Sequence, residues 1–137
     1  MATETVFDPF AMSITKPTSF GECFQHHRAA LGLTLRKFCQ VNGFDPGNIS
    51  KLERGIHQAP EDRDILAKYA RVLGLVEGTA AWREFSDFAA ADRGRLPDEL
   101  LADSELVKRL PALLRTIDDK KLTPAQLDRL IELIRQA

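Results

Sequence analysis

Two turn signals that lie close together most constrain the fold of this chain. Asn42-Gly43 ends one stretch in which apolar residues have helical spacing, and Asp45-Pro46 begins the next. Glycine readily adopts the left-handed backbone that ends a helix, an aspartate side chain accepts hydrogen bonds from free amides at a helix start, and proline needs no donor at the first helical position. Residues 38–55 are therefore predicted to form two short helices joined by a tight turn.

Most of the chain after residue 17 has the same helical character. Apolar residues recur at spacings of three and four, and no stretch alternates with a period of two, so the fold class is predicted to be all-α. Pro111 lies inside one apolar stripe and is expected to kink or split that helix. The expected helices cover residues 20–31, 34–41, 45–54, 61–73, 79–92, 106–117 and the segment that starts at Thr123-Pro124.

The length of 137 residues suits one compact domain or a domain with an appendage. Residues 1–18 lack helical periodicity and are expected to form a flexible arm. Two cysteines are too few for a disulfide scaffold, and the chain opens with neither a secretory segment nor an apolar run long enough to span a bilayer. These features predict a cytoplasmic protein with no membrane partner.

The charge is nearly balanced overall, with a formal net charge of −1, which argues against a protein that coats nucleic acid indiscriminately. The basic and acidic side chains are less evenly distributed along the chain. Residues 19–58 carry five basic and three acidic side chains, a local balance of +2. This mild bias is compatible with a specific reader of DNA.

Three short motifs stand out: Leu31-Gly32-Leu33-Thr34, Asn42-Gly43-Phe44 and the segment from Ile49 to Gly55. Together they resemble the helix-turn-helix family of phage repressors and Cro, which are XRE-like transcriptional regulators. The resemblance covers about residues 20–75. It implies a four-helix DNA-binding domain over residues 19–75, followed by a smaller C-terminal helical region, residues 76–137, that dimerises or binds a partner.

The resemblance also implies residue roles, because the start of the recognition helix in this family approaches base edges. The base-facing candidates are Pro46, Gly47, Asn48 and Lys51. The phosphate-binding candidates are Thr34, Arg36, Lys37 and Arg54. Arg28 and Glu53 occupy positions that form a structural ion pair in the family. Two departures stand out: Leu35 replaces a common glutamine, and Lys37 replaces the acidic residue of a capping box.

The C-terminal apolar stripes exceed what a minimal helix-turn-helix domain needs for its own core. They could form a hairpin within one chain or an interface between two subunits, and we favour the interface because two recognition helices can read both halves of an inverted repeat. The dimerisation candidates are Leu106, Leu110, Leu113, Leu127, Leu130, Ile131 and Ile134.

The leading interpretation is a homodimeric, sequence-specific transcriptional regulator, most simply a repressor, that binds double-stranded DNA. The alternative is an antitoxin-like protein whose C-terminal helices bind a partner protein such as a toxin, while the N-terminal domain autoregulates. A third reading makes the C-terminal region a target for cleavage or for an effector.

Other residue patterns predict neither an enzyme nor a cofactor. Cys23-x-x-His26 has a ligand-like spacing, but no second pair completes a tetrahedral site, so no metal is expected. His27 is expected to be a core histidine with satisfied hydrogen bonds. Trp82, Phe85 and Phe88 lie three apart and are expected to be core rather than an effector pocket. The chain has no nucleophile elbow and no phosphate-binding glycine loop.

Overall fold

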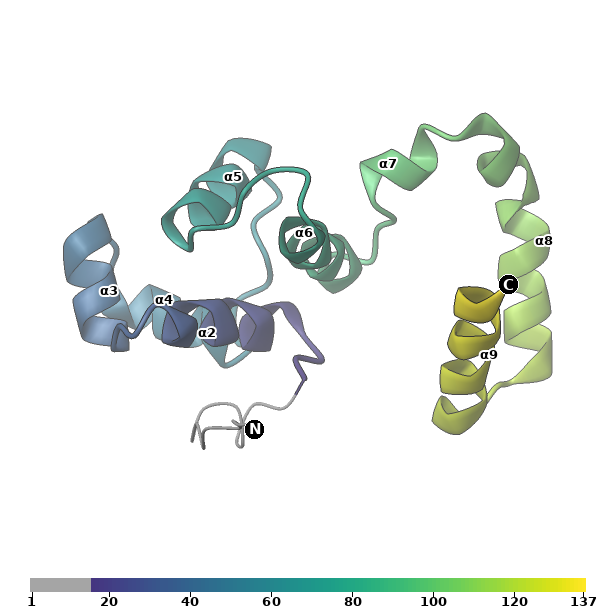
Figure 1. Cartoon of the computed structure of the whole chain (residues 1–137), viewed down its shortest axis with the longest axis horizontal. Helices are drawn as coiled ribbons and strands as arrows, with labels where there is room; N and C mark the ends of the chain where they lie inside the picture. Colours follow the sequence, from purple (N-terminus) through teal and green to yellow (C-terminus); the bar gives the residue numbers. More distant parts are fainter. Residues whose placement is uncertain (1–15) are drawn as a thin grey trace. The chain divides into compact units, whose positions relative to one another are not determined.

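In the computed structural model, the structure describes residues 16–137, which form eight α-helices and no strand (Figure 1). The predicted all-α fold class is confirmed. The chain divides into two compact units, the first ending at Pro97 and the second running from Asp98 to Ala137. The flexible arm expected over residues 1–18 lies for the most part outside the described residues.

The first unit contains five of the helices. Each begins after a side chain that accepts a backbone N–H bond. The capping residues are Ser19, Thr34, Asp45, Asp62 and Thr79. The observed ends lie within about two residues of the expected ones. The helices are α2 (Phe20–Ala30), α3 (Leu35–Asn42), α4 (Pro46–Glu53), α5 (Arg63–Val72) and α6 (Ala80–Asp92).

Aromatic side chains from several helices form the core of this unit. Four phenylalanine side chains each expose less than 2% of their surface: Phe20, Phe24, Phe38 and Phe85. The rings of Phe24 and Phe38 meet edge to face at 5.8 Å between centroids, and those of Phe20 and Phe85 lie 5.0 Å apart. Edge-to-face pairs add about 0.5–1.5 kcal/mol to the free energy of burial. These contacts join α2, α3 and α6 into one core.

Helix α6 therefore belongs to the first unit, which corrects the expected domain boundary after residue 75. Phe85 and Ala89 of α6 are buried in the same core as α2. At the end of α6, the Asp92 carboxylate accepts a bond of 2.6 Å from the backbone N–H of Ala59, and Arg93 donates to the Ala59 carbonyl at 2.6 Å. The apolar spacing of α6 predicts a buried face but does not say which helix covers it.

The second unit contains α7 (Asp98–Leu101), α8 (Ser104–Lys120) and α9 (Pro124–Gln136). A capping box between Thr123 and Gln126 starts α9. Of the kink or split expected at Pro111, the split is wrong, because α8 continues through this residue. Pro111 is exposed, so water can reach the carbonyl group that lacks a helical donor there.

Candidate nucleic-acid interface

Helices α3 and α4 form the predicted helix-turn-helix, and local backbone chemistry fixes the turn. Gly43 ends α3 in the left-handed region with φ of 72°, where glycine has no steric penalty. The N–H of Phe44 then donates to the Cys39 carbonyl at 2.9 Å. The Asp45 carboxylate accepts from the N–H of Asn48 at 2.9 Å and starts α4. Cys39 is small and fully buried in the core of the unit.

Helix α4 has one buried face and one exposed face. Ile49 and Leu52 are 3% and 5% exposed and anchor the helix in the core. The four residues predicted to face bases, Pro46, Gly47, Asn48 and Lys51, are all exposed. Three of them lie in the first turn of α4, where the short side chains leave the helix end accessible to another molecule. This arrangement offers amide and ammonium groups to a molecule outside the core.

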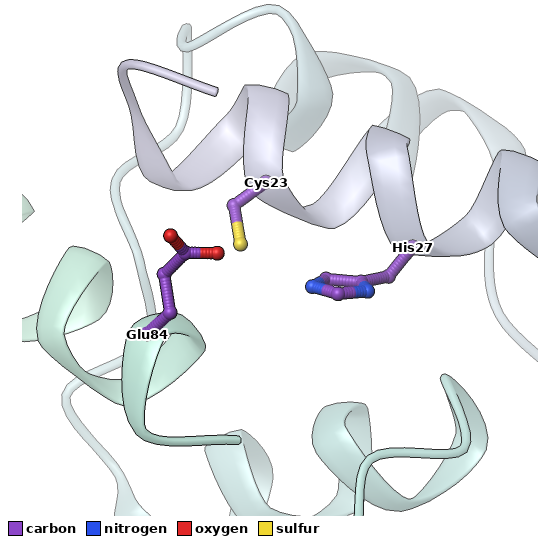
Figure 2. Close-up of side chains that lie close together, drawn as sticks. All are labelled: Cys23, His27 and Glu84. Atoms are coloured by element: carbon purple, nitrogen blue, oxygen red, sulfur yellow. The ribbon is translucent and has the colours of Figure 1, made fainter. Parts of the chain in front are cut away.

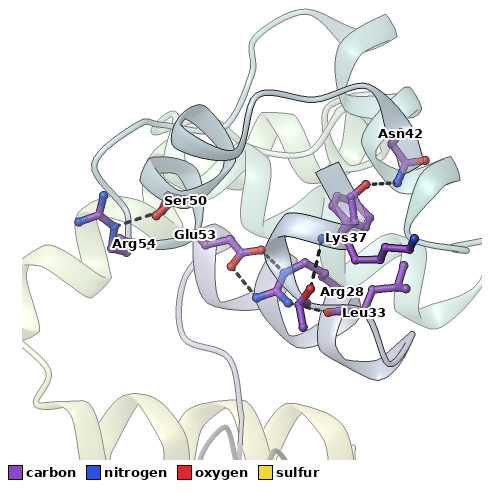
Figure 3. Close-up of polar contacts among 9 residues, drawn as sticks. Arg28, Leu33, Lys37, Asn42, Ser50, Glu53 and Arg54 are labelled. Atoms are coloured by element: carbon purple, nitrogen blue, oxygen red, sulfur yellow. Dashed lines mark hydrogen bonds and ion pairs between the residues drawn. The ribbon is translucent and has the colours of Figure 1, made fainter. Parts of the chain in front are cut away.

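A buried ion pair fastens α2 to the end of α4. The Arg28 guanidinium donates twice to the Glu53 carboxylate, at 2.7 and 2.9 Å, and a third bond of 2.8 Å reaches the Leu33 carbonyl (Figure 3). Arg28 and Glu53 are each 8% exposed. The pair expected from the family resemblance is thus present. Because both charges are satisfied inside the unit, they do not contribute to its outer charge.

Gly21 allows α2 and α4 to pack closely, a role that was not predicted from the sequence. A methyl group at this position would lie 2.5 Å from the carbonyl oxygen of Leu52 and 2.6 Å from that of Glu53. Such distances are sterically forbidden, and the obstructing atoms are backbone. Glycine is therefore required here by helix contact and not by a turn.

The predicted phosphate-binding residues fall into two groups. Arg36 and Lys37 are exposed, and neither pairs with a carboxylate among residues 16–137. Thr34 caps α3, because its hydroxyl oxygen accepts a hydrogen bond from the N–H of Lys37 at 3.2 Å. Arg54 is exposed but bends back along α4, where its Nε donates to the Ser50 carbonyl at 3.4 Å. Without Arg28 and Glu53, which pair with each other inside the unit, residues 19–58 carry four basic and two acidic side chains.

A cluster of Cys23, His27 and Glu84 lies between α2 and α6 (Figure 2). The expectation that His27 has satisfied hydrogen bonds is wrong, because its buried Nε2 has no partner among residues 16–137. Burial lowers the pKa of His27, and His26 lowers it further while Glu84 opposes the shift. Burial, helped by the Glu84 carboxylate, raises the pKa of the Cys23 thiol to about 12. His26, the histidine of the ligand-like spacing, is not in the cluster.

The predicted dimerisation residues are at most half-buried. Within residues 98–137 no side chain is buried. Leu106, Leu110 and Leu130 are half-buried, whereas Leu113, Leu127, Ile131 and Ile134 are exposed. Leu114 and Leu133, which were not among the candidates, are also exposed at 54% and 61%.

Comparisons with protein-family models, with curated proteins and with solved structures found no match. Membership of the repressor and Cro family therefore rests on the motifs quoted above and stays a prediction. In the described part of the chain, no helix combines the length and the apolar character needed to cross a bilayer.

Proposed function

We propose that this protein is a sequence-specific DNA-binding regulator that acts as a homodimer and represses transcription by occupying an inverted repeat. The observation that carries the proposal is the two-faced α4. Its inner side is fixed by Ile49, Leu52 and the Glu53 ion pair. Asn48 in the first turn and Lys51 in the last turn are both exposed.

The exposed groups match the chemistry of the major groove. The Asn48 side-chain amide can donate an N–H to N7 of adenine while its carbonyl oxygen accepts from the N6 amino group, which gives a bidentate contact with that base. The Lys51 ammonium can donate to O6 and N7 of guanine, and the Pro46 ring can contact a thymine methyl group. Gly47 presents no side chain, so the backbone can approach the groove closely.

Basic side chains of α3 supply contacts that carry no sequence information. Arg36 and Lys37 are free to reach phosphates because no carboxylate among the described residues holds them. Such contacts fix the position of a protein on the duplex and make affinity depend on salt. Arg54 can add a contact once it leaves the Ser50 carbonyl.

Self-association follows from the poor burial of the second unit. A helical segment of roughly 40 residues does not usually bury enough surface for independent stability. Covering apolar side chains such as Leu113, Leu127 and Ile131 with a second copy would contribute on the order of 1.5–3 kcal/mol each when burial is complete. In a twofold dimer the two α4 helices would meet successive major grooves about 34 Å apart.

Two substitutions separate base reading from phosphate binding. Lys51→Ala should cost about 1–3 kcal/mol of binding free energy and relax the preference at one base pair of each half-site. Arg36→Ala should weaken all duplexes alike and reduce the salt slope by about one ion per half-site. The measurement is a salt titration of binding to a selected duplex and to single-base variants of it. Equal behaviour of the two variants would contradict the assigned roles.

A charge placed on the apolar face of α9 tests the dimer. Ile131→Glu should convert the protein to a monomer in sedimentation analysis and abolish cooperative binding to the inverted repeat, because burying a carboxylate in an apolar interface is costly. Ala125→Glu introduces the same charge on the polar face of α9 and should leave the dimer intact. A wild-type protein that is monomeric at micromolar concentration, on and off DNA, would contradict the dimer.

The antitoxin-like alternative uses the same apolar faces. It predicts a second protein that copurifies at equal stoichiometry from the native host and is lost with Ile131→Glu. The homodimer proposal predicts instead that the purified chain alone accounts for the complex on DNA.

A further inference from the structure

We propose that Cys23, His27 and Glu84 form a binding site for a late first-row divalent metal ion, of which Zn²⁺ suits the donor set best. The Cys23 sulfur, a ring nitrogen of His27 and a carboxylate oxygen of Glu84 lie within 4.8 Å of one another. Figure 2 shows the two side chains of α2 and the Glu84 side chain of α6 directed toward a shared space. This proposal does not rest on DNA binding.

The geometry is close to that of a coordinated ion. Zinc–sulfur and zinc–nitrogen bonds of about 2.3 and 2.0 Å put neighbouring ligand atoms of a tetrahedral site roughly 3.5 Å apart. Cys23 and His27 are one helical turn apart on α2 and so project from the same face. Glu84 is exposed, and rotation of its long side chain can close the remaining difference.

The chemistry of the three groups favours a cation. Among the described residues, the buried Nε2 of His27 has no hydrogen-bond partner, an unfavourable state that a metal–nitrogen bond relieves. The Cys23 thiol is protonated at neutral pH, so metal binding would release that proton to the solvent and form a thiolate. One thiolate and one carboxylate then neutralise the two positive charges of the ion. A neutral imidazole completes the protein ligands.

Three protein ligands leave a fourth position for water, and the exposed Glu84 keeps this side open to solvent. Sites of this kind exchange their ion more readily than closed four-ligand sites. The ion would link α2 to α6, the two helices whose phenylalanine side chains meet in the core. Because α2 also holds α4 through the Arg28–Glu53 pair, a bound ion would stiffen the unit that presents α4.

Cobalt provides a direct readout, because Co²⁺ bound to a thiolate absorbs in the near ultraviolet and tetrahedral Co²⁺ absorbs in the visible. The full-length protein, reduced and freed of metal with a chelator, is titrated with Co²⁺ and then with Zn²⁺. We expect one Co²⁺ per chain, a thiolate charge-transfer band, and displacement of Co²⁺ by Zn²⁺. Zn²⁺ should also raise Tm, as any ligand of the folded state does.

Three variants and three matched controls test the ligands. Cys23→Ser should abolish the thiolate band, and His27→Gln and Glu84→Gln should each raise the apparent Kd at least about tenfold. Glu84 is exposed, so its substitution leaves the fold intact, as circular dichroism can verify. Cys39→Ser, His57→Gln and Glu77→Gln alter the same residue types outside the cluster and should keep wild-type affinity.

A wild-type protein that shows no thiolate band in excess Co²⁺ would overturn the proposal. Wild-type affinity in both His27→Gln and Glu84→Gln would overturn it as well. The proposal would also be overturned if Cys39→Ser lost the thiolate band while Cys23→Ser retained it, because the ion would then be bound by Cys39.

Discussion

Glu53→Ala is expected to lower the free energy of unfolding of the first unit by about 3–5 kcal/mol, because it leaves the Arg28 guanidinium buried without its counter-charge. The two bonds of 2.7 and 2.9 Å would be lost together, and only the bond to the Leu33 carbonyl would remain. Since Glu53 lies on the inner side of α4, the sequence preference of the folded protein should change little.

Denaturant unfolding followed by fluorescence measures this loss. The single tryptophan and single tyrosine of the chain, Trp82 and Tyr69, both lie in the first unit, so the signal reports that unit. Glu61→Ala is the matched control, because it removes an exposed partner of Arg95 at 3.6 Å and should cost at most about 1 kcal/mol. Equal losses in the two variants would show that the buried pair does not fasten α4.

Phe85→Ala is expected to destabilise the same unit by about 3–5 kcal/mol. The Phe85 ring is fully buried, 5.0 Å from the ring of Phe20 and 6.5 Å from that of Phe24. Its removal leaves a cavity between α2 and α6 that the neighbouring rings cannot fill without moving. The result would show that the domain carrying α4 extends beyond residue 75.

The same fluorescence measurement applies, at a fixed protein concentration. Val76→Ala removes apolar atoms from a residue that is 67% exposed and should change stability by less than about 0.5 kcal/mol. If α6 served only self-association, Phe85→Ala would alter the oligomeric state and leave the stability of the first unit unchanged. That outcome would restore the boundary expected from the sequence.

Features with local causes could be predicted from the sequence. Thr34, Asp45 and Thr123 start helices because their side chains bond amides only two or three residues away. Gly43 ends α3 through its own backbone freedom. The all-α class, the turn between α3 and α4, and the exposed start of α4 follow from such signals together with apolar spacing.

Features that depend on tertiary contacts could not be predicted. Gly21 is set by the approach of the α4 carbonyls, and no turn signal marks it. The spacing Cys23-x-x-His26 does not mark the cluster, because His27 and not His26 lies beside Cys23, and the third group, Glu84, comes from another helix. The placement of α6 required knowing that its aromatic face meets that of α2.

We propose that the exposed face of α4, from Pro46 to Lys51, enters the major groove of DNA, and dimethyl sulfate footprinting can detect this contact. The reagent methylates guanine N7, which lies in the major groove. On a duplex selected from a random pool at physiological salt, the protein should protect guanines in two half-sites about 10 base pairs apart. Lys51→Ala should restore reactivity at one guanine of each half-site, whereas Arg36→Ala should not. A pool that yields no preferred sequence, or a bound duplex whose guanine N7 atoms all react as freely as in naked DNA, would contradict the account.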